Sequence, residues 1–125
     1  MTKTIRNWKT AGLTDDFIFN KVMLDEEICL EVIRRVLPDL DIQKIEIPNA
    51  QKEMKFAPDA KGIRFDIYTK DAHNNRYDVE MQMENKTNLI KRMRYYQAVN
   101  ALDSYEKGKD YLKANDSYVI FFLLF

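Results

Sequence analysis

The sequence predicts an α/β protein with a mixed sheet, and three observations support this. Two runs, residues 63–68 and 77–83, alternate apolar and polar side chains as half-buried strands do. A third run, residues 117–125, is almost wholly apolar, which is typical of a strand buried on both faces. Between them, residues 86–106 carry apolar side chains at helical spacing over the length of a crossover, so the last strand is expected to add parallel to the sheet.

The segment before the first strand is expected to be helical. A helix is predicted to begin at Thr14 or Asp15, and the pattern restarts at Asp25. From there apolar residues recur at helical spacing as far as Leu37, and Pro38 ends the segment. One face of this helical segment is therefore expected to join the core.

One more strand is predicted before the two alternating runs. Residues 43–47 alternate and stop at Pro48, whereas residues 48–60 are expected to form a loop, in which Met54 and Phe56 allow a short strand. The whole order is then helix, strand, strand, strand, helix, strand. Residues 1–12 show no period and are expected to form an N-terminal arm before a single domain of residues 13–125.

The two alternating runs are expected to form a hairpin whose register follows from its apolar side chains. Phe65 and Ile67 should share the buried face with Val79 and Met81, because a slip of one residue would split this set. A loop of five residues, 71–75, satisfies that requirement and is a common hairpin length. A two-residue turn within this loop would divide the apolar face.

The same register places Asp66 directly opposite Glu80. Like charges opposed on neighbouring strands destabilise a sheet, so the pair calls for a metal ion, a proton or a basic partner. Carboxylate oxygens are ligands that Mg²⁺ prefers. The pair is a candidate metal site, and the ordinary alternative is a solvated face of the sheet.

Composition limits the class of protein. The chain has 125 residues, enough for one domain, and its 20 basic and 20 acidic side chains cancel, so any basic patch for nucleic acid must be local. The single Cys29 excludes an internal disulfide, its apolar neighbours favour a core position, and a reducing, cytoplasmic location is expected. One histidine and one cysteine do not favour a zinc site. No apolar run approaches the roughly 18 residues that span a bilayer, so no membrane partner is expected.

Four short segments, taken in order, resemble the PD-(D/E)XK nuclease superfamily, in its branch of recombination-promoting nucleases and transposases. They are residues 13–22, the triplet Glu80-Met81-Gln82, residues 91–97 and residues 106–111. The resemblance extends from residue 13 to about residue 121 and implies a restriction-endonuclease-like core. Members usually continue past the last strand, so it also implies a C-terminally shortened chain. The literal Pro58-Asp59 pair precedes the strand, and the superfamily aspartate is therefore assigned to Asp66.

The resemblance implies that Asp66 and Glu80 are metal ligands of a Mg²⁺-dependent or Mn²⁺-dependent DNA endonuclease. It places Gln82 where the superfamily usually has lysine; a glutamine amide can hydrogen-bond the attacking water but carries no charge. An acid from the first helix often completes such sites, and Glu27 and Glu31 are the candidates, with Glu31 the one assigned.

Basic and aromatic side chains follow the hairpin in the sequence. Arg92 is expected to reach a phosphate, and Lys91 and Arg94 to add attraction that is independent of sequence. Tyr95 is expected either to stack on a base or to pack in the core. Without the resemblance, these cations would be an ordinary solvated face of a helix.

Two other functions stay open. A degenerate or shortened relative would keep the fold and act as a DNA-binding or dimerisation module without catalysis. A structural homodimer would use the apolar C-terminal tail and Trp8 as its contact face. Metal binding separates the first alternative from a nuclease, and the molar mass in solution tests the second.

Overall fold

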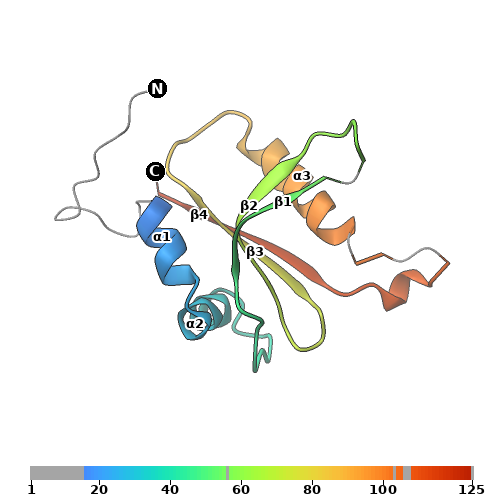
Figure 1. Cartoon of the computed structure of the whole chain (residues 1–125), viewed down its shortest axis with the longest axis horizontal. Coiled ribbons are helices and arrows are strands. Elements are labelled where there is room, and N and C mark those ends of the chain that lie inside the picture. The colour runs from blue at the N-terminus through green and yellow to red at the C-terminus, as the bar shows by residue number, and fades with distance from the viewer. Residues whose placement is uncertain (1–15, 56, 103, 106–107, 125) are drawn as a thin grey trace.

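The computed structural model describes residues 16–55, 57–102, 104–105 and 108–124 (Figure 1). Its helices are α1 (Asp16–Met23), α2 (Glu26–Val36) and α3 (Leu89–Leu102), with a 3₁₀ turn η1 (Tyr111–Lys113), and its strands are β1 (Asn49–Met54), β2 (Ile63–Lys70), β3 (Arg76–Gln82) and β4 (Ser117–Leu123). The predicted order is confirmed, with the first helical segment divided in two. The predicted arm, Trp8 and the helix start at Thr14 or Asp15 lie outside the described residues, as does Phe125.

The four strands form one mixed sheet in the order β1-β2-β3-β4. β1 and β2, and likewise β2 and β3, pair antiparallel, whereas β4 pairs parallel to β3. The parallel pair requires a crossover, and α3 supplies it, as the sequence predicts. Among the described residues, no helix has both the length and the apolar character needed to cross a bilayer.

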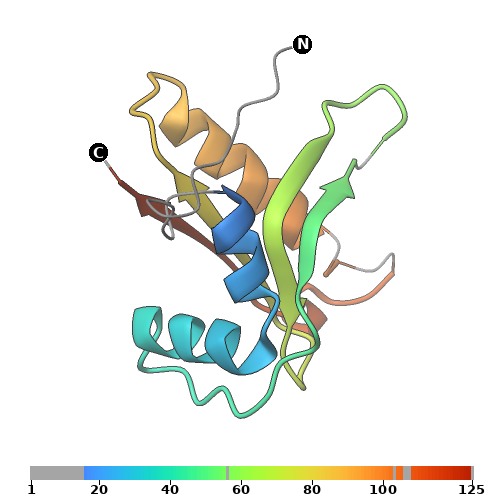
Figure 2. The ribbon, with the colours of Figure 1, turned by 60° about the vertical axis from the view of Figure 1, so that its left-hand side comes forward.

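Helices cover both faces of the sheet (Figure 2). On one face, α1 and α2 pack through a buried cluster that includes Phe19, Met23, Cys29, Ile33, Ile67, Tyr77, Val79 and Ile120. On the other face, α3 packs through Val99, Tyr95 and Tyr96 against Ile63, Phe65 and Tyr68. Cys29 is fully buried, and burial raises the pKa of its thiol to about 12, which agrees with the predicted core role.

The predicted hairpin register is confirmed by the pairs Ile67 with Val79 and Tyr68 with Asp78. The five-residue loop is held by Asp71, whose carboxylate accepts the Tyr77 hydroxyl at 2.7 Å and the Asn75 N–H at 3.0 Å. The loop therefore fixes which residues face each other along the two strands.

The predicted strand at residues 43–47 is wrong. Ile45 is buried and forms one isolated bridge with Asp71, but Ile47 is 72% exposed, so the two do not share a face. The strand lies at β1 instead, inside the segment that was expected to be a loop. β1 is an edge strand in which the exposed side chains are polar and the half-buried ones are Ala50, Lys52 and Met54, so its apolar signal is weaker than that of an inner strand.

The expectation that Phe65 and Ile67 share a buried face is also wrong. Ile67 packs with α1 and α2, whereas Phe65 packs with α3, its ring 5.7 Å from the ring of Tyr96. Asp66 lies between them, and opposite it in β1 the residue Gln51 has a positive φ of 57°. This backbone distortion and the change of face on β2 both fall where the acidic pair lies.

Candidate active site

The carboxylates of Asp66 and Glu80 lie beside each other on β2 and β3, and each accepts a backbone hydrogen bond from the other strand. The N–H of Asp66 donates to Glu80 Oε2 at 2.7 Å, and the N–H of Met81 donates to Asp66 Oδ2 at 3.1 Å. The regular ladder between these strands ends one step earlier, at Ile67 and Val79. Side chains thus replace the ladder at the position that the sequence predicts for the acidic pair.

A third acid, Asp78, lies close to this pair. It is fully buried on β3, two residues before Glu80, and no N–H or hydroxyl of the described residues reaches either of its oxygens. Burial raises the pKa of Asp78 far above its ordinary range, and a hydrogen bond with Glu80 and the charges of Glu80 and Asp66 act in the same direction. These influences favour the protonated form of Asp78, which can donate to the Glu80 carboxylate.

Opposing interactions act on the pKa of Glu80. Burial, the largest, raises the pKa of Glu80, and the charge of Asp66 adds to this. The hydrogen bonds from Asp78 and from the Asp66 N–H, and the guanidinium of Arg92, lower that pKa. Glu80 is consequently a carboxylate whose ionisation depends on the positive charge near it.

Gln82 and Arg92 form a unit beside the acidic pair. Arg92 donates from one nitrogen to Gln82 Oε1 at 2.7 Å and from another to the hydroxyl of Tyr96 at 3.3 Å. Gln82 in turn donates to the carbonyl of Glu84 at 2.7 Å. Both ends of the Gln82 amide therefore have protein partners, and its position favours a role in holding Arg92 over the predicted role of orienting water.

Asp66, Glu80 and Arg92 line a cleft of about 680 Å³ on the α3 side of the sheet, whereas Asp78 and Gln82 do not line it. Its lining includes Asp66 and Glu80 together with five cations, Lys61, Arg64, Lys86, Lys91 and Arg92. Of these cations, only Lys91 and Arg92 are predicted from the sequence to bind phosphate. The local excess of positive charge arises although the chain as a whole is neutral, and it favours an anionic ligand.

Tyr95 lies at the cleft, but its hydroxyl is engaged. It donates to the backbone carbonyl of Lys61 at 2.5 Å, which ties α3 to the loop before β2. The ring also packs on the α3 side of the core. This placement favours packing, one of the two roles expected of Tyr95, over stacking on a base.

Four of the sequence candidates do not line the cleft, and Gln82, which is buried beside Arg92, is one of them. Glu31 is on α2, packed on the opposite face of the sheet, and its carboxylate pairs with Arg35 at 3.0 Å. Glu27, also on α2, and Arg94, on α3, are exposed and do not line the cleft. The assignment of Glu31 as a third metal ligand is therefore not supported by its position.

The donor set fits a hard divalent ion. Among the described residues, no group of three or more His, Cys, Asp and Glu side chains is arranged to hold a metal. Mg²⁺ keeps several waters and is commonly bound through only one or two carboxylates together with substrate phosphates. Asp66 and Glu80 provide two such carboxylates with like charges close together, which a divalent cation would relieve.

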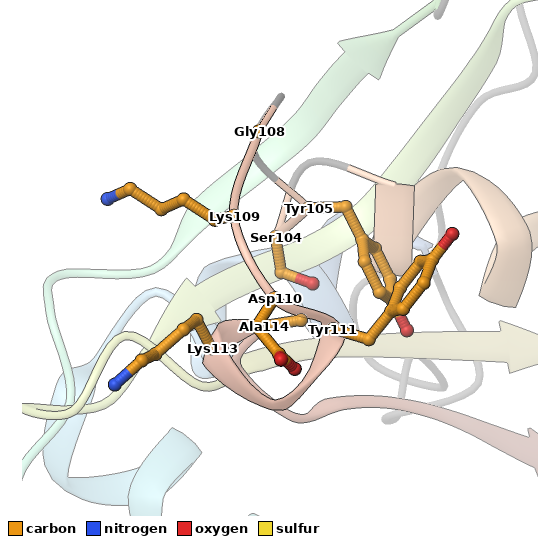
Figure 3. A pocket seen from close by; sticks show the side chains of 8 residues that line it. All are labelled: Ser104, Tyr105, Gly108, Lys109, Asp110, Tyr111, Lys113 and Ala114. Carbon is orange, nitrogen blue, oxygen red and sulfur yellow. The ribbon is translucent and has the colours of Figure 1, made fainter.

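A larger hollow of about 830 Å³ lies beyond the end of α3, and its described lining comes from residues 104–105 and 108–114 (Figure 3). The rings of Tyr105 and Tyr111 meet there edge to face, 6.1 Å apart. Its acid, Asp110, is engaged in capping η1 through the N–H of Leu112 at 2.8 Å. The described lining of this hollow has no paired carboxylates, so the smaller cleft is the better candidate for the chemistry.

Comparison with protein families agrees with this geometry. The family model described as PD-(D/E)XK nuclease family transposase matches residues 13–125, nearly the whole chain. A comparison with curated proteins and one with solved structures each found no match. The four-stranded mixed sheet with helices on both faces is consistent with the restriction-endonuclease-like fold that the sequence predicts. The chain belongs to the PD-(D/E)XK nuclease family transposases.

Proposed function

We propose that the chain is a divalent-metal-dependent DNA endonuclease in which Asp66 and Glu80 hold Mg²⁺ or Mn²⁺. The observation that carries this proposal is the reciprocal placement of the two carboxylates, bonded to each other's strands and open to a cleft rich in basic side chains. Family membership supports the nuclease class and DNA as the substrate. The cytoplasmic location and a homodimer stay predictions.

The chemistry follows from the charges in the cleft. A divalent ion in such a site activates water and neutralises the charge that develops on phosphate. Asp66 and Glu80 would hold the ion, with Asp78 orienting Glu80 by a hydrogen bond. Arg92, fixed by Gln82 and by the Tyr96 hydroxyl, supplies a preorganised positive charge for the phosphate. Lys86 and Lys91 add attraction for the rest of the backbone.

Nicking of a supercoiled plasmid tests the proposal. Wild-type protein is expected to nick in Mg²⁺ or Mn²⁺ and to be inactive in EDTA. Glu80→Gln should abolish nicking while keeping an acceptor for the Asp66 N–H, so the fold is retained. Asp59→Asn is the matched control, because Asp59 is exposed and does not line the cleft.

The two variants also test the choice of aspartate. Loss of nicking in Asp59→Asn would move the superfamily aspartate to the literal Pro58-Asp59 pair. Nicking that persists in Glu80→Gln would exclude the acidic pair as the catalytic centre. DNA binding without nicking in any metal would favour the second function, a DNA-binding module.

A further inference from the structure

We infer that the β1–β2 hairpin forms the second wall of the nucleic-acid-binding surface, with Lys61 and Arg64 contacting backbone phosphates across the cleft from the cations of α3. The inference rests on the proposed function, because it assigns how the same cleft holds its substrate. Neither cationic side chain belongs to the four segments that resemble the family.

The first observation is the two-sided lining of the cleft. One side comes from residues 61–64, in the loop before β2 and at the start of that strand. The other side comes from Lys86 and Asn88, just before α3, and from the first turns of α3. Asp66 and Glu80 line the same cleft, so a chain that contacts both walls would cross the acidic pair.

The second observation is that two cationic side chains on each wall are exposed and have no acidic partner among the described residues. Lys61 and Arg64 are exposed, and within the described ranges of the chain neither makes an ion pair. The same holds for Lys86 and Lys91 on the opposite wall. Exposed cations without acidic partners, gathered around one cleft of a neutral chain, are the electrostatic footprint of a polyanion.

The third observation is a hydrogen bond that connects the two walls of the cleft. The Tyr95 hydroxyl donates to the carbonyl of Lys61 at 2.5 Å, so the backbone at Lys61 is anchored to α3 while its ammonium group stays exposed. This anchoring lowers the entropy lost when a phosphate is bound, because the loop is already placed. The cations lie on two connected walls, with the acidic pair between them. This arrangement suits an extended phosphate backbone better than a small anion.

The experiment measures how DNA affinity depends on salt in the absence of metal, so that no cleavage occurs. A fluorescein-labelled 20-base-pair duplex is titrated in EDTA at several salt concentrations with wild type, with Lys61→Gln/Arg64→Gln and with Lys44→Gln/Lys113→Gln. The last variant is the matched control, because it also loses two exposed positive charges, at positions that do not line the cleft. Each lost phosphate contact is expected to reduce the slope of log K against log salt by about 0.9.

The expected result is a slope about 2 smaller for Lys61→Gln/Arg64→Gln than for wild type, with the control unchanged. Equal slopes for the two double variants would overturn the inference, and so would wild-type protein that does not bind the duplex. Thermal unfolding checks that both variants fold, as exposed substitutions should.

Plasmid nicking, measured in parallel, separates this inference from the proposed function. If wild type nicks DNA and the two double variants have equal slopes, the nuclease function is supported, and phosphate binding by Lys61 and Arg64 is contradicted. If wild type does not nick DNA but the expected difference in slope is found, Lys61 and Arg64 bind DNA in a module that does not cleave it.

Discussion

Asp66 and Glu80 are joined by a hydrogen bond between backbone and side chain, in which the N–H of Asp66 donates to the Glu80 carboxylate at 2.7 Å. The bond holds two acidic side chains together where the β2–β3 ladder stops. The backbone N–H groups and the Arg92 guanidinium partly offset the repulsion between them. A site of this kind is held ready for a cation by the surrounding fold.

Arg92→Gln is expected to reduce plasmid nicking by about 100-fold, because it removes a preorganised charge next to the reacting phosphate. Affinity for Mg²⁺ should not fall, since a positive charge near the acidic pair has been removed. The measurement is nicking rate together with a calorimetric Mg²⁺ titration.

Arg94→Gln is the control for Arg92→Gln, because Arg94 is on the same helix but exposed and away from the cleft. It should keep nearly full activity. A parallel loss of nicking and Mg²⁺ affinity in Arg92→Gln would contradict the assigned role and indicate a structural one.

Asp78→Asn is expected to stabilise the metal-free protein at pH 8 and to flatten its dependence on pH. Above the ordinary aspartate pKa of 3.8, the unfolded chain releases the Asp78 proton while the folded chain, with its raised pKa, retains it. Stability from this group is therefore full at low pH and is lost as pH rises, by up to about 1.4 kcal/mol per pH unit.

Urea unfolding at pH 5, 6, 7 and 8 measures the effect of Asp78→Asn. The difference in free energy of unfolding between variant and wild type should grow with pH, whereas the exposed Asp59→Asn should show no such trend. A difference that is constant with pH would mean that Asp78 is ionised in the folded protein.

Tyr95→Phe is expected to lower the free energy of unfolding by about 0.5–1.5 kcal/mol and to loosen the loop before β2. The substitution removes only the hydroxyl that bonds to the Lys61 carbonyl and keeps the ring in the core. Amide exchange at residues 57–63 should become faster, as measured by mass spectrometry.

Tyr105→Phe is the matched control for Tyr95→Phe, because the Tyr105 ring is 51% exposed and its hydroxyl has no hydrogen-bond partner in the described part of the chain. It should leave exchange at residues 57–63 unchanged. Unchanged exchange in Tyr95→Phe as well would show that this hydrogen bond does not hold the two walls together.

The sequence could predict the hairpin and the acidic pair because both depend on local rules. Alternating apolar residues and a five-residue loop fix the register, and the register brings Asp66 to Glu80. The change of face between Phe65 and Ile67 could not be predicted, since it departs from the regular alternation of a strand on which the prediction was based.

Other parts of the site depend on long-range packing. Lys61 and Arg64 reach the cleft through the β1–β2 hairpin, and the apolar signal of β1 is too weak to reveal that hairpin. The position of Asp78 could have been predicted, because residues two apart on a strand lie on the same face and Glu80 is two residues later. Nothing in the sequence shows, however, that the oxygens of Asp78 lack hydrogen-bond donors among the described residues. Glu31 was chosen from a family tendency alone, and α2 packs on the other face.

Calorimetric titration of Mg²⁺ at pH 8 tests the central claim most directly. Wild-type protein is predicted to bind, and Asp66→Asn and Glu80→Gln, which keep their hydrogen-bond acceptors but lose one charge each, should bind more than about tenfold more weakly. If wild type binds no divalent ion, or if both variants bind as tightly as wild type, the acidic pair is not a metal site.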